Sequence, residues 1–330
     1  MKQFAITKND AGQRVDRWLA KTLPLLPAPL AQKYLRLKRV KRNGRPAKRD
    51  ERLETGDVVQ LYINDEFFQT PSRENAFLSV FKPQLDIVYE DENLLLLDKR
   101  PGLVVHPDDK ERVNTLLTHL QAYLYQKKEW SPYGERSFAP ALCNRIDRNT
   151  GGIVIAAKNA ETLRVMNQKI RDRELEKYYL CIVHGSMRPA AGTLKGFLLK
   201  DEDKAQVKVF HTSVPGGRTA VTRFRTLAEK NGLSLMECEL VTGRTHQIRA
   251  QFADAGHPLL GDGKYGRERD NRRRGRDYQA LYSYKLAFRF TTDAGVLNGL
   301  NGRVWTVKNV DFVEEYFPGV PVGTTERTRD

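Results

Sequence analysis

The sequence contains very little cysteine. Only three cysteines occur among its 330 residues, and no two of them form a C-x-x-C pair: Cys143, Cys181 and Cys238. An odd number of widely spaced cysteines argues against a disulfide framework and against a cysteine-ligated zinc site. A metal ligand role for His246 is the alternative, but the other histidines show no ligand spacing and no H-E-x-x-H segment occurs. We therefore expect no metal site.

Long apolar runs and cofactor motifs are also missing. The longest apolar runs, at residues 94–97 and 153–157, fall far short of the ~20 residues that a membrane helix needs. The first ten residues lack the apolar segment of a signal peptide, so we expect a cytoplasmic protein without a membrane partner. No phosphate-binding G-x-x-x-x-G-K-[ST] loop, no well-placed G-x-G-x-x-G and no G-x-S-x-G segment is present. Nucleotide hydrolysis and serine acyl transfer thus have no support, and we expect no cofactor.

Positive charge, by contrast, is plentiful. Lys and Arg number 56 against 41 Asp and Glu, which gives a net charge of +15. Residues 33–52 alone hold ten Lys or Arg among twenty positions. Such an excess favours a polyanionic partner, either nucleic acid or an anionic membrane surface, over a merely soluble basic protein. The membrane surface is disfavoured because no basic amphipathic helix with an apolar aromatic face is present.

The length and the periodicity indicate two domains, since a domain typically spans about 100–200 residues. Residues 1–64 combine two short amphipathic helices with strands around an Asn43-Gly44 turn, and they predict a small α+β unit with a basic edge. Residues 65–84 lack periodicity and read as a linker. From residue 85 to 330 strands dominate, with a helix after the N-cap residue Asn159, so the fold class is α+β rather than a doubly wound sheet. The one low-complexity tract is residues 267–276.

A first candidate site is the segment NRIDRNTGG at residues 144–152, directly before an apolar strand. Asp147 stands between Arg145 and Arg148, and nearby guanidinium charges favour an ionised carboxylate. An ionised carboxylate can serve as a nucleophile, a base or a metal ligand. The alternative is an ordinary turn residue or a simple ion pair.

Two further segments hold candidate ligand-binding side chains. Tyr178 and Tyr179 begin a strand and point to opposite faces, so only one of them can line a pocket and stack on a base. Ordinary strand packing is the alternative. The segment TGRTHQIR at residues 242–249 gathers groups that suit phosphate and ribose contacts, although Arg249 can equally be a helix-surface residue.

Together these segments resemble the RluA-type pseudouridine synthases, in particular RluC-like and RluD-like members. NRIDRNTGG looks like the family's H-R-L-D-x-x-T-S-G box, and residues 88–107 resemble the segment that opens its catalytic domain. K-Y-Y at residues 177–179 matches a K-x-Y box, and residues 242–249 match a further box whose last arginine pairs with the catalytic aspartate. The similarity runs in order from about residue 85 to 310. Residues 14–63 are similar to a small RNA-binding domain first seen in a ribosomal small-subunit protein.

The resemblance implies a pseudouridine synthase fold with a mixed, mainly antiparallel central sheet flanked by helices and loops, preceded by a small α+β RNA-binding domain. It implies isomerisation of uridine in structured RNA, without cofactor or metal, by the catalytic aspartate Asp147. The implied substrate-binding residues are Arg145, Tyr179, Ile248 and Arg249. Three positions depart from the family pattern: Asn144 replaces His, Gly151 replaces Ser, and Tyr282 replaces a common His.

The expected partner is RNA, most naturally large-subunit ribosomal RNA, with transfer RNA as the alternative substrate; no obligate protein partner is evident. Basic residues of the first unit are expected to bind phosphates: Lys33, Arg36, Arg39, Lys41, Arg42, Arg45 and Lys48. A non-catalytic RNA-binding or ribosome-assembly protein is the competing function. The complete set of Asp147, Tyr179 and Arg249 argues against it.

Overall fold

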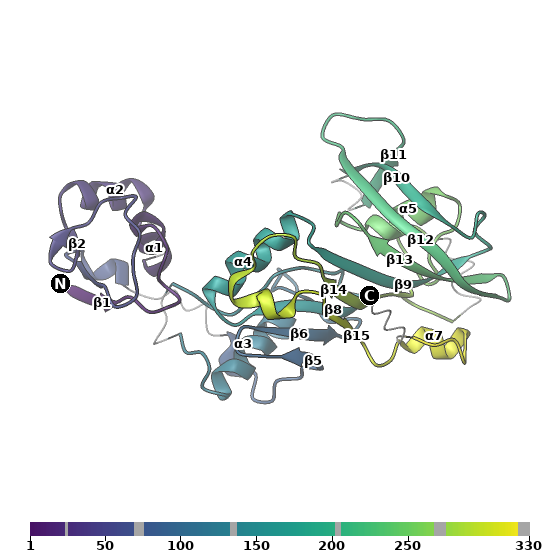
Figure 1. The fold of residues 1–330 in the computed structure, drawn as a ribbon, viewed down its shortest axis with the longest axis horizontal. Coiled ribbons are helices and arrows are strands. Elements are labelled where there is room, and N and C mark those ends of the chain that lie inside the picture. The colour runs from purple at the N-terminus through teal and green to yellow at the C-terminus, as the bar shows by residue number, and fades with distance from the viewer. Residues whose placement is uncertain (24–25, 69–75, 133–136, 202–205, 267–274, 323–330) are drawn as a thin grey trace.

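The computed structural model describes residues 1–23, 26–68, 76–132, 137–201, 206–266 and 275–322. The described residues form a four-stranded sheet and an 11-stranded sheet, in two parts of the chain (Figure 1). The low-complexity tract at residues 267–276 lies outside the described residues except for its last two positions. No helix among the described residues combines the length and apolar character needed to cross a bilayer.

The four-stranded sheet belongs to the N-terminal part and has its own core. Its strands lie in the order β1 (Lys2–Ala5), β4 (Val58–Leu61), β2 (Val40–Arg42) and β3 (Arg45–Pro46), and helices α1 (Val15–Thr22) and α2 (Ala28–Arg36) accompany it. Val15, Trp18 and Leu19 lie on one face of α1 because they are three and four residues apart, and they are buried with residues of both inner strands. Asn43 and Gly44 both have positive φ, which suits the tight β2–β3 turn.

This small unit contacts the rest of the chain through buried polar groups. The backbone N–H of Ala160, at the start of helix α4 (Ala160–Arg171), donates to Asn9 Oδ1 at 2.9 Å. The carboxylate of Asp10 accepts from the hydroxyl of Ser137 and from Trp18 Nε1. Gln13 Nε2 donates to Ser137 Oγ at 3.1 Å. The turn at residues 7–13 is therefore the surface by which the small unit rests beside α4 (Figure 1).

The large sheet carries the remaining strands. Its order is β11 (Gln206–Phe210), β10 (Ala191–Asp201), β12 (Arg218–Lys230), β13 (Leu233–Leu240), β9 (Leu175–His184), β14 (Leu281–Phe288), β8 (Gly151–Ala157), β6 (Leu94–Lys99) and β5 (Ile87–Glu90), with β15 (Val304–Thr306) on β14 and β7 (Ala141–Leu142) on β8. Among the described strand pairs of this sheet, only β14 and β8 run parallel. The mixed, mainly antiparallel sheet confirms the expected α+β fold.

Helices cover both faces of the sheet. Alternate residues of β6 and β8 belong to two different cores, one shared with α3 (Leu116–Gln126) and one shared with Met166 of α4. Figure 1 shows α3 and α4 on opposite sides of these strands. Helix α5 (Gln247–Asp254) packs on β9 and β13 through Ile248 and Phe252. As expected, Asn159 caps α4, because its side chain accepts from the N–H of Thr162.

The sequence alone does not reveal strands β10, β11 and β14 or helix α3. In β14 all but one residue is buried, so its sequence, LYSYKLAF, shows no alternation between polar and apolar positions.

The segment at residues 65–84, which the sequence predicts to be a linker, is partly packed. Phe67 and Phe68 contact the small unit's core, and Phe77 is buried against α3.

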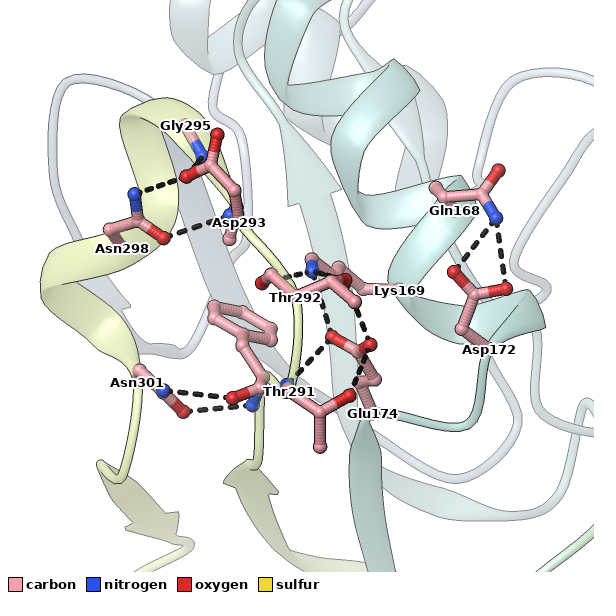
Figure 2. A network of polar contacts seen from close by, with 12 residues as sticks. Gln168, Lys169, Asp172, Glu174, Thr291, Thr292, Asp293, Gly295, Asn298 and Asn301 are labelled. Carbon is pink, nitrogen blue, oxygen red and sulfur yellow. Dashed lines mark hydrogen bonds and ion pairs between the residues drawn. The ribbon is translucent and has the colours of Figure 1, made fainter.

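A buried network of charges and hydroxyls fixes the start of β9 (Figure 2). Lys169 Nζ lies 2.8 Å from Glu174 Oε2, and the two side chains are only 2% and 5% exposed. The hydroxyls of Thr291 and Thr292 donate to the other Glu174 oxygen at 2.7 and 2.9 Å. The bonds to Lys169 and these hydroxyls lower the pKa of Glu174 to about 2. The segment after β14 is thus tied to the junction between α4 and β9.

We expect Glu174→Gln to lower the midpoint of thermal unfolding by several degrees, because Lys169 would keep its charge without a carboxylate partner. The pKa of Glu174 is below its usual value of 4.5, so its contribution to stability is complete above about pH 4.5 and is lost between pH 4.5 and 2. The variant should therefore show a weaker loss of stability over that range. Calorimetry between pH 2 and 7 measures both effects, with the exposed Glu314→Gln as the matched control.

Candidate active site

Asp147 lies in the loop between β7 and β8, with its side chain 27% exposed. Its Oδ2 accepts a hydrogen bond of 2.8 Å from Nη1 of Arg249. Its Oδ1 makes no hydrogen bond with any described residue. One carboxylate oxygen is thus fixed by a charge-assisted bond, and the other is available to a bound molecule.

Arg249 is itself held by a second carboxylate. Its Nε and Nη2 donate to Asp262 Oδ2 and Oδ1 at 2.7 and 2.9 Å, a bidentate pair in which the arginine side chain is 6% exposed and the aspartate side chain fully buried. Burial raises the pKa of Asp262, but the bonds to Arg249 outweigh it and the net pKa is lowered. Burial lowers the pKa of Arg249, and Asp262 and Asp147 reverse this into a raised pKa. Both groups therefore stay charged, and the guanidinium has a fixed direction toward Asp147.

The turn before α5 places Arg249 by internal hydrogen bonds. Gln247 Oε1 accepts from the hydroxyl of Thr242 and from the backbone N–H of Arg244. Its amide donates to Val221 O and Thr222 Oγ1 of β12. These bonds fix the first turn of α5 on the sheet, two residues before Arg249.

Two of the predicted substrate-binding residues, Tyr179 and Ile248, are buried side chains. They belong to the same buried cluster, from β9 and α5 respectively, whereas Tyr178 packs against the opposite core, as the strand periodicity predicts. Burial raises the pKa of Tyr179 to about 12, and the nearby charge of Asp147 acts in the same direction. Tyr179 therefore keeps its hydroxyl proton at neutral pH.

Lys99 stabilises the loop that carries Asp147. This fully buried side chain lies at the end of β6, and its Nζ donates to the backbone oxygens of Arg100, Leu103 and Arg148 at 2.8–2.9 Å. Burial lowers its pKa to about 7, while the charge of Asp147 opposes the shift. The lysine thus ties residues 100–103 to the backbone that directly follows Asp147.

The flanking arginines do not have the role that the sequence suggested for them. Arg148 points to Asp108, with 4.0 Å between Nη2 and Oδ2, and Arg145 is exposed and makes no ion pair with a described residue. Neither arginine forms an ion pair with Asp147, so the cation in direct contact with the carboxylate is not one of its sequence neighbours. Arg249, 102 positions along the chain, provides that charge instead.

The three departures from the family pattern have local explanations. Asn144 Oδ1 accepts from the backbone N–H of Ile155 at 2.8 Å. A Cβ on Gly151 would lie 2.3 Å from the ring of Tyr282, so the small residue in β8 and the large one in β14 require each other. The Tyr282 hydroxyl donates to Asp98 at 2.7 Å. None of these contacts involves Asp147.

The basic residues predicted to bind phosphates in the small unit differ in how exposed their side chains are. Five of them are exposed: Lys33, Arg36, Arg39, Arg45 and Lys48. Lys41 is half-buried, with its ammonium 5.1 Å from the ring centre of Tyr62. Arg42 ion-pairs with Glu51 and Asp57, and only 17% of its side chain is exposed. The Arg42 charge is thus already compensated within the small unit.

Sequence reasoning missed Asp262, Lys99 and Tyr265, which approach the site only in the folded chain. Their segments give no signal of this role, because the pairing partners are distant in sequence. As for metals, the described parts of the chain contain no group of three or more His, Cys, Asp or Glu side chains able to hold an ion.

Comparisons with known proteins show what this chain is similar to. The family model described as RNA pseudouridylate synthase matches residues 93–254. An uncharacterized RNA pseudouridine synthase of Mycoplasma genitalium is 32% identical over 87% of this chain and 88% of its own length. The ribosomal large subunit pseudouridine synthase C of Vibrio cholerae is 33% identical over 80% of both chains. Synthase D of Borreliella burgdorferi is 32% identical over 68% of both.

The fold is also shared with a solved structure. Human RNA Pseudouridylate Synthase Domain Containing 4 superposes with a TM-score of 0.53 at 21% identity, over 68% of this chain and 89% of that one. The similarity to the bacterial relatives extends over most of both chains, and the family model covers residues 93–254, the range that contains Asp147, Tyr179 and Arg249. This chain belongs to the RNA pseudouridylate synthase family and is an RNA pseudouridine synthase of the RluA type.

Proposed function

We propose that the protein isomerises specific uridines in large-subunit ribosomal RNA, with Asp147 as the catalytic carboxylate. The observation that carries the proposal is the arrangement of this side chain. Arg249 holds Oδ2 at 2.8 Å, Oδ1 has no hydrogen bond to a described residue, and Tyr179 lies close enough for the charge of Asp147 to act on its hydroxyl. A reactive carboxylate needs this combination of fixed orientation and a free lone pair.

The chemistry follows from the groups present. The reaction breaks the bond between uracil N1 and the ribose and rejoins the base through C5, so bonds rearrange within one nucleotide. Asp147 either attacks a carbon atom or removes a ribose proton, and both roles require a carboxylate, whose Oδ2 the Arg249 guanidinium holds. Tyr179, which keeps its proton, packs against the uracil and offers a hydroxyl for proton handling. The base must leave its stack to reach these groups, and the exposed Arg145 can stack where it leaves.

Two observations support ribosomal RNA as the substrate. Relatives from Vibrio cholerae and Borreliella burgdorferi carry names that specify the ribosomal large subunit. The small unit presents exposed cations on α2 and the β2–β3 hairpin. Asn9 accepts a hydrogen bond from the first N–H of α4 and Asp10 accepts one from Ser137, and these bonds fix where the unit lies. We propose that residues 1–64 form an RNA-binding domain that grips phosphates at a set distance from Asp147. Transfer RNA remains the alternative substrate.

Asp147→Asn is expected to reduce product formation by several orders of magnitude, the scale seen when a nucleophile or general base is lost. The substitution keeps the size of the side chain but removes the charge, so neither attack nor proton removal survives. RNA affinity should persist or rise slightly, because one negative charge leaves a site that binds a polyanion. Single-turnover tritium release from RNA labelled at uridine C5, beside a filter-binding titration, measures both quantities.

The matched control is Asp172→Asn, which removes the same charge from an exposed position at the end of α4. It should leave the rate unchanged. If Asp147→Asn reacts at more than about a tenth of the rate of the unmodified enzyme, the catalytic assignment is wrong.

Tyr179→Phe should reduce the reaction rate more than it reduces RNA affinity, since the ring still packs on the base while its hydroxyl is absent. The same single-turnover and filter-binding assays measure both quantities.

Replacing Lys33, Arg36 and Arg45 together by Gln should weaken RNA binding and flatten its salt dependence. The slope of log K against log salt should fall by roughly 0.7–0.9 for each phosphate that is no longer bound. The control triple variant also removes three positive charges, but at exposed positions outside the small unit, namely Arg173, Arg303 and Lys308. An equal change of slope in both variants would show that the small unit contributes only general charge.

The substrate itself is tested by offering labelled transcripts of large-subunit ribosomal RNA and of transfer RNAs to the purified enzyme. We expect stoichiometric tritium release, at one or a few uridines, from the ribosomal transcripts only. Release from transfer RNA alone, abolished by Asp147→Asn, would refute the ribosomal substrate while leaving the catalytic site intact.

A further inference from the structure

His246 is the second side chain that faces Asp147. Its Nε2 lies 3.7 Å from Asp147 Oδ2, the same oxygen that Arg249 holds. His246 immediately precedes α5 and has a φ of +53°, in the left-handed region that residues other than glycine rarely adopt. Its side chain makes no capping hydrogen bond to the helix. Helix capping therefore does not account for this conformation, whereas placing the imidazole beside the carboxylate does.

Tyr265 determines which way the imidazole proton points. The Tyr265 hydroxyl accepts a hydrogen bond of 2.8 Å from the backbone N–H of Val207 and lies 2.8 Å from His246 Nδ1. No other described residue accepts the hydrogen of this hydroxyl, so it is satisfied by donating that hydrogen to Nδ1. The neutral imidazole then carries its own hydrogen on Nε2, directed at Asp147. Burial lowers the pKa of His246, which favours this neutral form at neutral pH.

Tyr265 is held as firmly as Arg249. Its backbone N–H donates to Asp262 Oδ1 at 3.1 Å, and its ring lies 5.3 Å from the Arg249 guanidinium carbon. The same fully buried Asp262 thus orients both supports of Asp147, one through Arg249 and one through Tyr265 and His246. Tyr265 also links the site to β11 through Val207, so three separate segments fix the imidazole.

We propose that His246, oriented by Tyr265, is a positioning residue for Asp147. It directs its Nε2–H to Oδ2, so that Arg249 and His246 together immobilise one oxygen and leave Oδ1 for the reaction. A separation of 3.7 Å exceeds a hydrogen bond, which spans about 2.7–3.2 Å, and the contact is expected to shorten when RNA closes the site. The inference rests on the proposed catalytic role of Asp147.

Two substitutions of His246 distinguish the roles of its two ring nitrogens. His246→Asn places an amide near Nδ1, tolerates the left-handed backbone and removes the donor that faces Asp147. His246→Gln places an amide near Nε2 and keeps that donor. In single-turnover assays on C5-tritiated RNA, the Asn variant should be slowed by about tenfold to a hundredfold, the scale of one hydrogen bond to a charged group. The Gln variant should remain within about threefold of the unmodified enzyme.

RNA affinity and the unfolding midpoint are measured for both variants, and neither should change appreciably. Tyr265→Phe, which frees Nδ1 and lets the imidazole adopt either tautomer, should give a smaller rate loss than His246→Asn. An unchanged rate in the Asn variant would overturn the proposal. An equal loss in the Asn and Gln variants at unchanged affinity would overturn it too, because a donor at the Nε2 position would then have no effect.

Asp147→Asn, assayed in parallel, separates this inference from the proposed function. If Asp147→Asn is active, the catalytic assignment fails and the role of His246 fails with it. If Asp147→Asn is inactive and His246→Asn reacts at the full rate, only the positioning role is wrong.

Discussion

The site depends on the hydrogen bonds that the buried guanidinium of Arg249 makes to two carboxylates. The guanidinium uses three of its nitrogens on two carboxylates, holding Asp262 through two bonds and Asp147 through one. A buried charge without its partner costs about 3–5 kcal/mol, so Asp262 is required for Arg249 to remain charged where it is. The fully buried Asp262 keeps the guanidinium in one orientation, and that orientation presents a donor to a carboxylate that solvent and substrate can still reach.

The sheet brings these groups together from distant parts of the chain. Asp147 precedes β8, Tyr179 lies in β9, and Arg249 belongs to the helix that packs on β9 and β13. Strand β14 separates β8 from β9 in the sheet, and its parallel pairing with β8 at Gly151 and Gly152 requires close approach of the two backbones. The buried pair of Lys169 and Glu174 fixes the beginning of β9, and Lys99 fixes the loop after Asp147 (Figure 2 shows the former). The supports of the site thus lie mainly in the protein interior.

The small unit has its own core, so other contacts must fix its position relative to the rest of the chain. Asn9 accepts from the first N–H of α4, a group that the helix itself cannot satisfy, and Asp10 and Gln13 bond to Ser137. These are directional polar contacts, so they specify an orientation that apolar contact alone would leave variable. They therefore fix where the small unit lies relative to α4.

Sequence alone determined the family, the α+β class and the positions of Asp147, Tyr179 and Arg249, because these lie in short segments whose residue types and spacing are diagnostic. It also determined the local elements whose signals are local, such as the Asn159 cap and the Asn43-Gly44 turn. Only the tertiary structure decided which cation holds Asp147. The adjacent Arg145 and Arg148 form no ion pair with it, and Arg249 reaches it from 102 positions away. The contacts that Asp262, Lys99, His246 and Tyr265 make around the site were likewise beyond sequence reasoning, because a long-range hydrogen bond leaves no periodicity or spacing by which the chain alone can reveal it.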